Sequence, residues 1–281
     1  MLFLTLPTLA FDGAAALEAT RRAVSFGPRP AGSAAHAKMR GWLTAEIRRL
    51  PCQLVEDTFT SRTPLGSRSM TNLIAKFPGS SGRVIIVSGH YDTYSRPGLR
   101  FVGANDGGSS TGFLLQLART LAAQKRRDSV WVVWFDGEES LVQWTGDDHT
   151  YGSRHLVELW RKEGLLRSIT ALINVDMIGD AGLNLLYDLN STAWLRDLVW
   201  SLAGRLGYSA QFPTHQPSAI EDDHVPFLQA GVPALDLIDY DYGPGNAYWH
   251  TDGDTMEKLS ARSFEVVGQV VVGAIQTLEG R

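Results

Sequence analysis

Short apolar runs that alternate with segments of helical periodicity constrain the fold of this chain more than any other feature. Residues 84–92 and 129–139 have the composition of buried strands, and the segments 108–124 and 152–163 that follow them have apolar residues at helical spacing. Strands that alternate with helices form a mostly parallel, twisted sheet with helices on both faces. The sequence therefore predicts an α/β fold.

The remaining elements are predicted from the same two patterns. Further helices are expected at 14–25, 33–48, 191–207 and 261–278, and further strands at 53–60, 70–77, 171–180, 183–189 and 233–239. A chain of 281 residues can form one large domain or two small ones. The sequence contains no internal repeat and no low-complexity linker that would divide it.

Composition excludes several classes of protein. Hydrophobic residues make up 44% of the chain and charged residues 20%, as in ordinary globular proteins. The net charge of −4 and the lack of a basic run argue against nucleic acid as a partner. The single cysteine, Cys52, rules out an intrachain disulfide and a cysteine-rich zinc cluster. No apolar stretch reaches the ~20 residues that span a bilayer, and the polar surface is compatible with a monomer.

The first ten residues, MLFLTLPTLA, are apolar but contain no Lys or Arg. They fit two interpretations: the remnant of a trimmed signal peptide, or an arm that packs on the domain. We favour the first, which predicts a periplasmic or secreted protein.

Polar clusters end three of the apolar runs. They are HYD at 90–92, DGEE at 136–139 and NVDMIGD at 174–180. In open α/β sheets, ligands bind in a crevice outside the carboxyl ends of the strands, so these clusters are expected to line one site. The candidate metal ligands of the chain are His90, Asp92, Asp106, Glu138, Glu139, Asp176, Asp222, Asp223 and His250. Dispersed oxygen and imidazole donors suit a catalytic zinc, which needs three protein ligands and one open position.

The adjacent carboxylates Glu138 and Glu139 are the sharpest of these features. Neighbouring side chains on an extended segment point to opposite sides. One carboxylate can therefore bind a metal while the other faces the substrate and transfers protons. A solvated acidic turn is the alternative, and the apolar run immediately before the pair argues against it.

Five segments in this order resemble the zinc-dependent aminopeptidase family: GHYD at 89–92, GANDGGSSTG at 103–112, the Glu pair, NVDMIGD, and YWHT at 248–251. The resemblance implies a single catalytic α/β domain over residues 1–281, of the zinc aminopeptidase-like, phosphorylase/hydrolase-like fold. It also implies a two-zinc site in which Glu138 is the general base. One zinc would be held by His90, Asp106 and Asp176, and the other by Asp106, Glu139 and His250.

A narrower resemblance is to the glutaminyl cyclases. The segments that carry it are WFDGEESLVQWTGDDHTYGSRHL at 134–156, EDDHVPFLQAGVP at 221–233, and Trp249 directly before His250. A longer, Trp-containing loop separates the Glu pair from YGSRHL. In that family a single zinc would be held by Asp106, Glu139 and His250. Glu138 would be the acid/base residue, Asp176 and Asp222 would form a hydrogen-bonded carboxylate network with it, and Trp144 and Trp249 would line the substrate pocket. His90 would not bind a second metal in a cyclase. On the two resemblances together, His90 and Asp92 are candidates for a second metal or for support of the site.

The cyclase resemblance implies that the chain converts N-terminal glutaminyl residues of peptides or proteins to pyroglutamate and releases ammonia. The alternative is a two-zinc aminopeptidase that uses water as the nucleophile. The loop that carries Trp144 favours the cyclase. A non-catalytic binding module is disfavoured because Glu138 and the metal ligands are all present. The chain departs from the cyclases at Asp236, where they have a His, and in the longer stretch 239–248.

Overall fold

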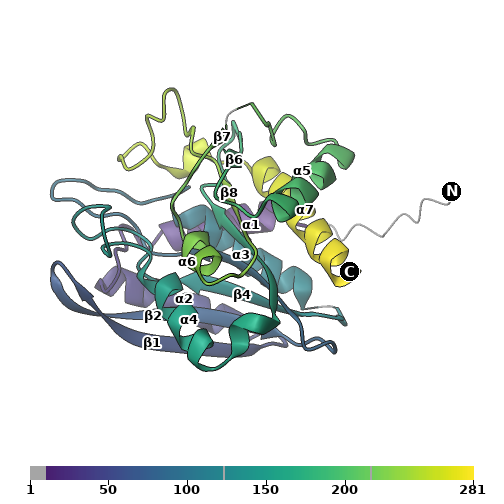
Figure 1. Ribbon diagram of the computed structural model, residues 1–281. Helices are drawn as coiled ribbons and strands as arrows, with labels where there is room; N and C mark the ends of the chain where they lie inside the picture. The colour runs from purple at the N-terminus through teal and green to yellow at the C-terminus, as the bar shows by residue number, and fades with distance from the viewer. Residues whose placement is uncertain (1–10, 123, 216) are drawn as a thin grey trace.

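Six strands of the protein form one mixed sheet in the order β1-β2-β4-β3-β5-β8 (Figure 1). The computed structural model describes residues 11–122, 124–215 and 217–281, so the expectations for residues 1–10 lie outside it. The strands are β1 (Gln53–Thr63), β2 (Gly66–Phe77), β3 (Val84–His90), β4 (Ser129–Phe135), β5 (Ile169–Asp176) and β8 (Ala234–Ile238). Strands β4, β3, β5 and β8 are parallel, and β2 is antiparallel to both of its neighbours. The predicted α/β fold is confirmed.

Strands β1 and β2 form a hairpin that is longer than the sequence predicts. Thr63 pairs with Gly66 across a tight turn, and the positive φ of +92° at Gly66 favours glycine there. Residues 66–69 are exposed, so they lack the apolar alternation by which a half-buried strand is recognised.

Helices cover both faces of the sheet, as predicted. Packed on one face are α1 (Gly13–Val24), α2 (Ala34–Ile47), α3 (Gly108–Leu121), α5 (Ala193–Arg205) and α7 (Ala261–Glu279). Packed on the other are α4 (Tyr151–Lys162) and α6 (His224–Gln229), which lie nearer the viewer in Figure 1. No helix in the described ranges is long and apolar enough to cross a bilayer.

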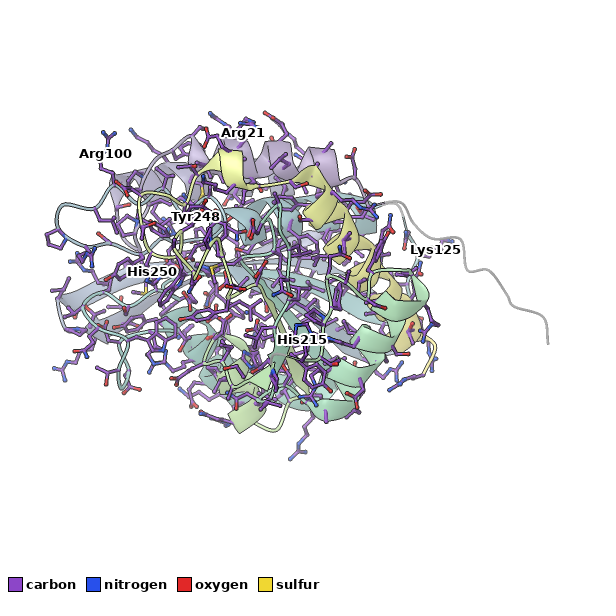
Figure 2. The ribbon with its side chains drawn as sticks, turned by 90° about the horizontal axis from the view of Figure 1, so that it is seen from above. Arg21, Arg100, Lys125, His215, Tyr248 and His250 are labelled. Atoms are coloured by element: carbon purple, nitrogen blue, oxygen red, sulfur yellow. The ribbon has the colours of Figure 1, made fainter. Side chains whose placement is uncertain are left out.

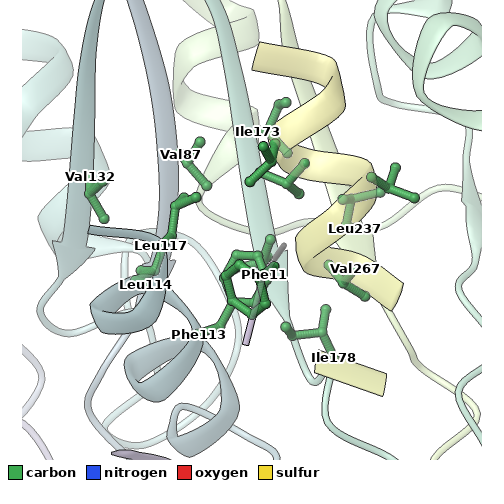
Figure 3. Close-up of a cluster of buried hydrophobic side chains, with 14 of the residues drawn as sticks. Phe11, Val87, Phe113, Leu114, Leu117, Val132, Ile173, Ile178, Leu237 and Val267 are labelled. Atoms are coloured by element: carbon green, nitrogen blue, oxygen red, sulfur yellow. The ribbon is translucent and has the colours of Figure 1, made fainter. Parts of the chain in front are cut away.

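Alternate residues of each central strand supply two hydrophobic cores. Ile85 and Val87 face the core shared with α1, α3 and α7, whereas Val84 and Ile86 face the core beneath α4 and α6. Figure 3 shows the first core, in which Val87 and Leu237 from the sheet lie near side chains of α3 and α7. Helix α1 packs so closely on α3 that a Cβ at Gly112 would lie 2.1 Å from Thr20 Oγ1, which favours glycine at this position.

Several elements differ from those predicted. Strand β4 ends before the DGEE cluster that it was expected to include, and β3 ends at His90, the first residue of the HYD cluster. The strand expected at 183–189 is reduced to β6 (Tyr187–Asp188), which pairs with β7 (Pro217–Ser218). Short helices were not predicted because each provides too few turns for a periodic pattern: α6, η1 (Leu165–Ser168) and η2 (Met256–Lys258).

The strand order reverses direction at β3. The chain passes from β3 through α3 to β4 on one side, and then through α4 to β5 on the other side of β3. In a doubly wound sheet this reversal opens a crevice at the carboxyl ends of the strands. His90 ends β3, Asp136 directly follows β4 and Asp176 ends β5, so the polar clusters predicted from the sequence meet at this crevice.

Candidate metal centre

Asp106, Glu139 and His250 converge at the crevice. Asp106 lies in the loop before α3, Glu139 follows β4 and His250 follows β8. One side-chain donor atom from each lies within 4.8 Å of the others. His250 Nε2 is 3.2 Å from both Asp106 Oδ2 and Glu139 Oε1. Segments far apart in the sequence thus supply a trio of donors that consists of two carboxylates and one imidazole.

A second trio shares Asp106. His90 Nε2 lies 3.1 Å from Asp106 Oδ1 and 3.1 Å from Asp176 Oδ1. All three residues are buried, and His90 is only 1% exposed. Because Asp106 offers a different oxygen to each trio, the geometry has room for one ion or for two.

The donor set fits a divalent cation. Neither carboxylate oxygen of the buried Glu139 accepts a hydrogen bond from the described part of the chain. Burial and the neighbouring charge of Asp106 raise the pKa of Glu139 to about 7. Burial lowers the pKa of His250, but the carboxylates of Glu139 and Asp106 outweigh it and raise that pKa to about 11. A cation among these ligands would replace the protons that the buried carboxylates otherwise need, and the two carboxylates and one imidazole suit zinc.

Two further carboxylates hold the backbone that carries the ligands. Asp254 accepts hydrogen bonds from the N–H groups of Asn105 at 2.8 Å and Asp106 at 3.1 Å. Asp92 accepts them from the N–H groups of Glu138 at 3.1 Å and Glu139 at 3.3 Å. Asp92 therefore positions the Glu pair through its backbone, and such outer contacts commonly orient metal ligands.

The ring of His250 is held between two aromatic side chains. Tyr94 stacks on one side, with ring centroids 4.1 Å apart, and Trp249 on the other at 4.2 Å. His250 has a φ of 52°, in the left-handed region that few non-glycine residues adopt. Figure 2 shows His250 and Tyr248 among the loops at one end of the molecule, while Lys125, which precedes β4, lies at the other. The sequence analysis missed Tyr94, although it lies only two residues beyond the HYD cluster.

A cavity of about 620 Å³ opens beside the two trios. Glu138, Asp176 and Asp222 line it with the Asp106–Glu139–His250 trio, and Trp144 and Trp249 form part of its wall. The cavity is therefore lined by every residue predicted for the site except His90, Asp92 and Asp223, which are buried but do not line it. Tyr240, from the unusual stretch 239–248, also lines the cavity.

Glu138 has the electrostatic surroundings of a proton-transfer group. It is 6% exposed, and burial raises its pKa well above the usual range. The charges of Glu139 and Asp222 raise that pKa further, whereas His90 opposes them. A carboxyl group with a raised pKa holds a proton more readily than an ordinary glutamate, as a proton-transfer residue must.

Hydrogen bonds to Asp148 fix the loop that carries Trp144. Asp148 accepts hydrogen bonds from the N–H groups of Leu141, Val142 and Gln143 at 2.9 to 3.1 Å. The hydroxyl of Tyr151 donates to the same carboxylate at 2.7 Å. The Trp144 ring stacks on His149, with centroids 4.3 Å apart. His149 thus supports a wall of the cavity.

With this geometry established, comparison with known proteins assigns the chain to a family. The model of peptidase family M28 matches residues 72–275. The chain belongs to peptidase family M28. A glutaminyl-peptide cyclotransferase of Drosophila melanogaster is 31% identical to this M28 chain over 271 residues, covering 87% of the chain and 75% of the relative.

Two solved structures extend the comparison of this M28 chain. A glutaminyl cyclase from an Acidobacteriales bacterium is 38% identical, with a TM-score of 0.94 over 100% of this chain and 99% of that one. A Zn-dependent exopeptidase from Parabacteroides distasonis is 25% identical, with a TM-score of 0.83 over 94% of this chain and 98% of that one.

Asp176 and Asp222 have separate polar partners in the M28 chain. Asp176 is hydrogen-bonded to His90 Nε2 at 3.1 Å, and Asp222 accepts from Asn174 Nδ2 at 2.9 Å. Both also line the cavity next to Glu138. The carboxylate network expected from the sequence therefore runs through His90 and Asn174, and the hydrogen bonds that the structure gives do not join the two acids directly.

Asp236 lies behind this cavity of the M28 chain. It is fully buried and accepts a hydrogen bond from Asn174 Nδ2 at 3.2 Å. The ring of His224 lies between Asp236 and Asp188, with Nδ1 3.9 Å from Asp236 and Nε2 3.3 Å from Asp188. The departure from the cyclases at Asp236 thus changes a buried polar cluster that supports Asp222 through Asn174.

Replacing Asp254 by Ala is expected to lower the free energy of unfolding by about 3 kcal/mol, because it leaves the buried N–H groups of Asn105 and Asp106 without an acceptor. Zinc affinity should fall about tenfold or more, since Asp106 loses its backbone support. Urea unfolding and zinc titration measure the two effects. Asp252→Ala, at an exposed neighbouring position, is the control. Equal stabilities for the two variants would contradict the role of Asp254.

Proposed function

We propose that the chain is a glutaminyl-peptide cyclotransferase, which converts an N-terminal glutaminyl residue to pyroglutamate and releases ammonia. The observation that carries the proposal is one cavity in which Glu138 and the Asp106–Glu139–His250 trio face a wall that includes Trp144 and Trp249. The relatives named glutaminyl-peptide cyclotransferase and glutaminyl cyclase support it.

Asp106, Glu139 and His250 are proposed to hold one zinc ion. The buried Glu139 oxygens, which accept no hydrogen bond in the described structure, and the name of the Zn-dependent exopeptidase support a zinc site here. A zinc ion held by these residues would supply Lewis-acid chemistry at the carbonyl of the substrate's side-chain amide. Tyr94 and Trp249 keep the His250 ring in place by stacking on its two faces.

Glu138 is proposed to transfer the proton of the reaction. The α-amine of the substrate attacks its own side-chain amide carbon, so that a new C–N bond closes a five-membered ring. Glu138 accepts a proton from the attacking amine and donates it to the departing nitrogen, which leaves as ammonia as the old C–N bond breaks. Because both reacting groups belong to one molecule, much of the entropy cost of bringing them together is already met.

The remaining lining residues orient the substrate and exclude water. Asp176 and Asp222 provide acceptors for the N–H groups of the amine and the amide. Trp144 and Trp249 cover the folded glutaminyl side chain, and water excluded from the cavity cannot compete with the amine.

A two-zinc aminopeptidase is the second candidate, and the His90–Asp106–Asp176 trio favours it. In that reaction Glu138 would serve as the base for an attacking water. His90 is buried and does not line the cavity, whereas the loop that carries Trp144 forms part of the cavity wall, so we place the cyclase first.

We expect a chelator to abolish turnover and one equivalent of zinc per chain to restore it. Glutaminyl peptides should then release ammonia and a pyroglutamyl product, while aminoacyl chromogenic substrates stay intact. Metal analysis, an ammonia assay and mass spectrometry of the product measure these outcomes. A requirement for two equivalents of zinc together with the release of free amino acids would establish the aminopeptidase instead.

A further inference from the structure

A second cavity, of about 560 Å³, lies beside the first. The two share Val142 and Gln143 in their linings, so the loop that carries Trp144 forms the divide between them. The far side of the second cavity is formed by the tip of the β1–β2 hairpin, with Arg62, Thr63 and Pro64. Neither the proposed reaction nor the metal centre uses this space.

The loop between the two cavities is exposed, but hydrogen bonds fix its backbone. Residues 142–147 are all exposed, and Val142 is 58% exposed. The carboxylate of Asp148 fixes the backbone of Val142 and Gln143 from below. An extended peptide can therefore lie across these two residues without displacing the loop, and the exposed valine offers it an apolar contact.

The proposed reaction determines the direction in which the rest of the substrate leaves. The glutaminyl residue must lie near Glu138 and the Asp106–Glu139–His250 trio, so the following residues pass out through the mouth. Lining residues that are exposed border that mouth on two sides, at 142–144 and at 218, 219 and 221. Within the described ranges, the border at 142–144 is the one that leads into the second cavity.

Charge distinguishes the same two borders. Glu221 places an exposed carboxylate on the second border. The second cavity contains Arg62, for whose side chain the described residues provide no ion pair or hydrogen bond. The acids of that cavity are already engaged, because Asp147 pairs with Arg154 at 2.7 Å and Asp148 binds the loop backbone and Tyr151. The second cavity is therefore a place for an acidic group.

We propose that the second cavity is a subsite for the residues that follow the cyclising glutamine. An apolar side chain would pack on Val142 and Pro64, and an acidic side chain or the peptide's terminal carboxylate would pair with Arg62. This inference rests on the proposed function, and it defines the preferred substrates as glutaminyl peptides with acidic residues beyond the first position.

The test compares glutamine amide with matched glutaminyl peptides that carry either Glu or Lys beyond the first position. For the wild-type chain, kcat/KM for the acidic peptide should exceed that for the basic one by about threefold to fivefold, the range of an exposed ion pair. Arg62→Gln should remove this preference and Arg62→Glu should reverse it. Turnover of glutamine amide, which has no following residue, should be unchanged in both variants.

Arg68→Glu is the matched control, because Arg68 lies on β2 of the same hairpin but does not line the cavity. It should keep the wild-type preference. An equal change in Arg68→Glu would overturn the subsite in favour of a general charge effect of the surface. Equal kcat/KM values of the wild-type chain for the two peptides would also overturn the subsite. Failure of the wild-type chain to cyclise glutamine amide would instead refute the proposed function.

Discussion

Glu138→Gln is expected to reduce kcat for cyclisation by about a hundredfold to ten-thousandfold while zinc binding stays at the wild-type level. Glu138 lines the cavity but belongs to neither trio of converging donors. Glutamine has nearly the same shape, and Asp92 would still accept the backbone N–H at this position. The variant therefore removes the group that transfers the proton and leaves the metal ligands in place.

Steady-state release of ammonia and metal analysis of the same preparation measure the two parts of this prediction. Glu56→Gln is the control. Glu56 lies on the edge strand β1 and does not line the cavity, so this variant should keep full activity. Near-normal turnover in Glu138→Gln would show that the roles within the Glu pair are assigned wrongly.

Glu139→Ala is expected to lose both zinc and activity. Its two oxygens are buried and lack hydrogen-bond partners in the described structure, so a metal ion is the ligand that best accounts for them. The affinity for zinc should fall more than about a hundredfold, beyond the usual effect of removing an outer contact. Isothermal titration of the metal-free protein measures this change.

Thermal unfolding gives a second measurement of the Glu139 variant. A metal that binds only the folded state raises the melting temperature by an amount that grows with the logarithm of its affinity. Zinc should raise the melting temperature of the wild-type chain and of Glu138→Gln, but not that of Glu139→Ala. An equal rise in all three would place zinc elsewhere in the protein.

The apolar runs were enough to predict the fold, but not every strand direction. Residues 84–90 and 129–135 are buried on both faces, which is typical of central parallel strands. The antiparallel direction of β1 and β2 depends on a tight turn at Gly66. An amphipathic pattern is the same for either direction, so the sheet order and its mixed character emerged only from the structure.

The rule that ligands gather at strand ends found the converging carboxylates and imidazoles, but not the residues that hold them. Tyr94, Asp254 and Asn174 act through contacts with residues distant in the sequence. Asp254 resembles any turn aspartate until the fold brings Asn105 and Asp106 to it. The role of Asp236 could not be predicted either, because the residues it clusters with, His224 and Asp188, come from other segments.

The origin of the metal ligands in separate crossovers affects how the chain folds. Asp106, Glu139 and His250 approach one another only when β3, β4 and β8 have taken their places in the sheet. Contacts between such distant segments form late, because the loops between them must close first. An ion bound there would consequently slow unfolding without guiding the early steps of folding. An ion would thus stabilise the finished fold, while the apolar strands direct its assembly.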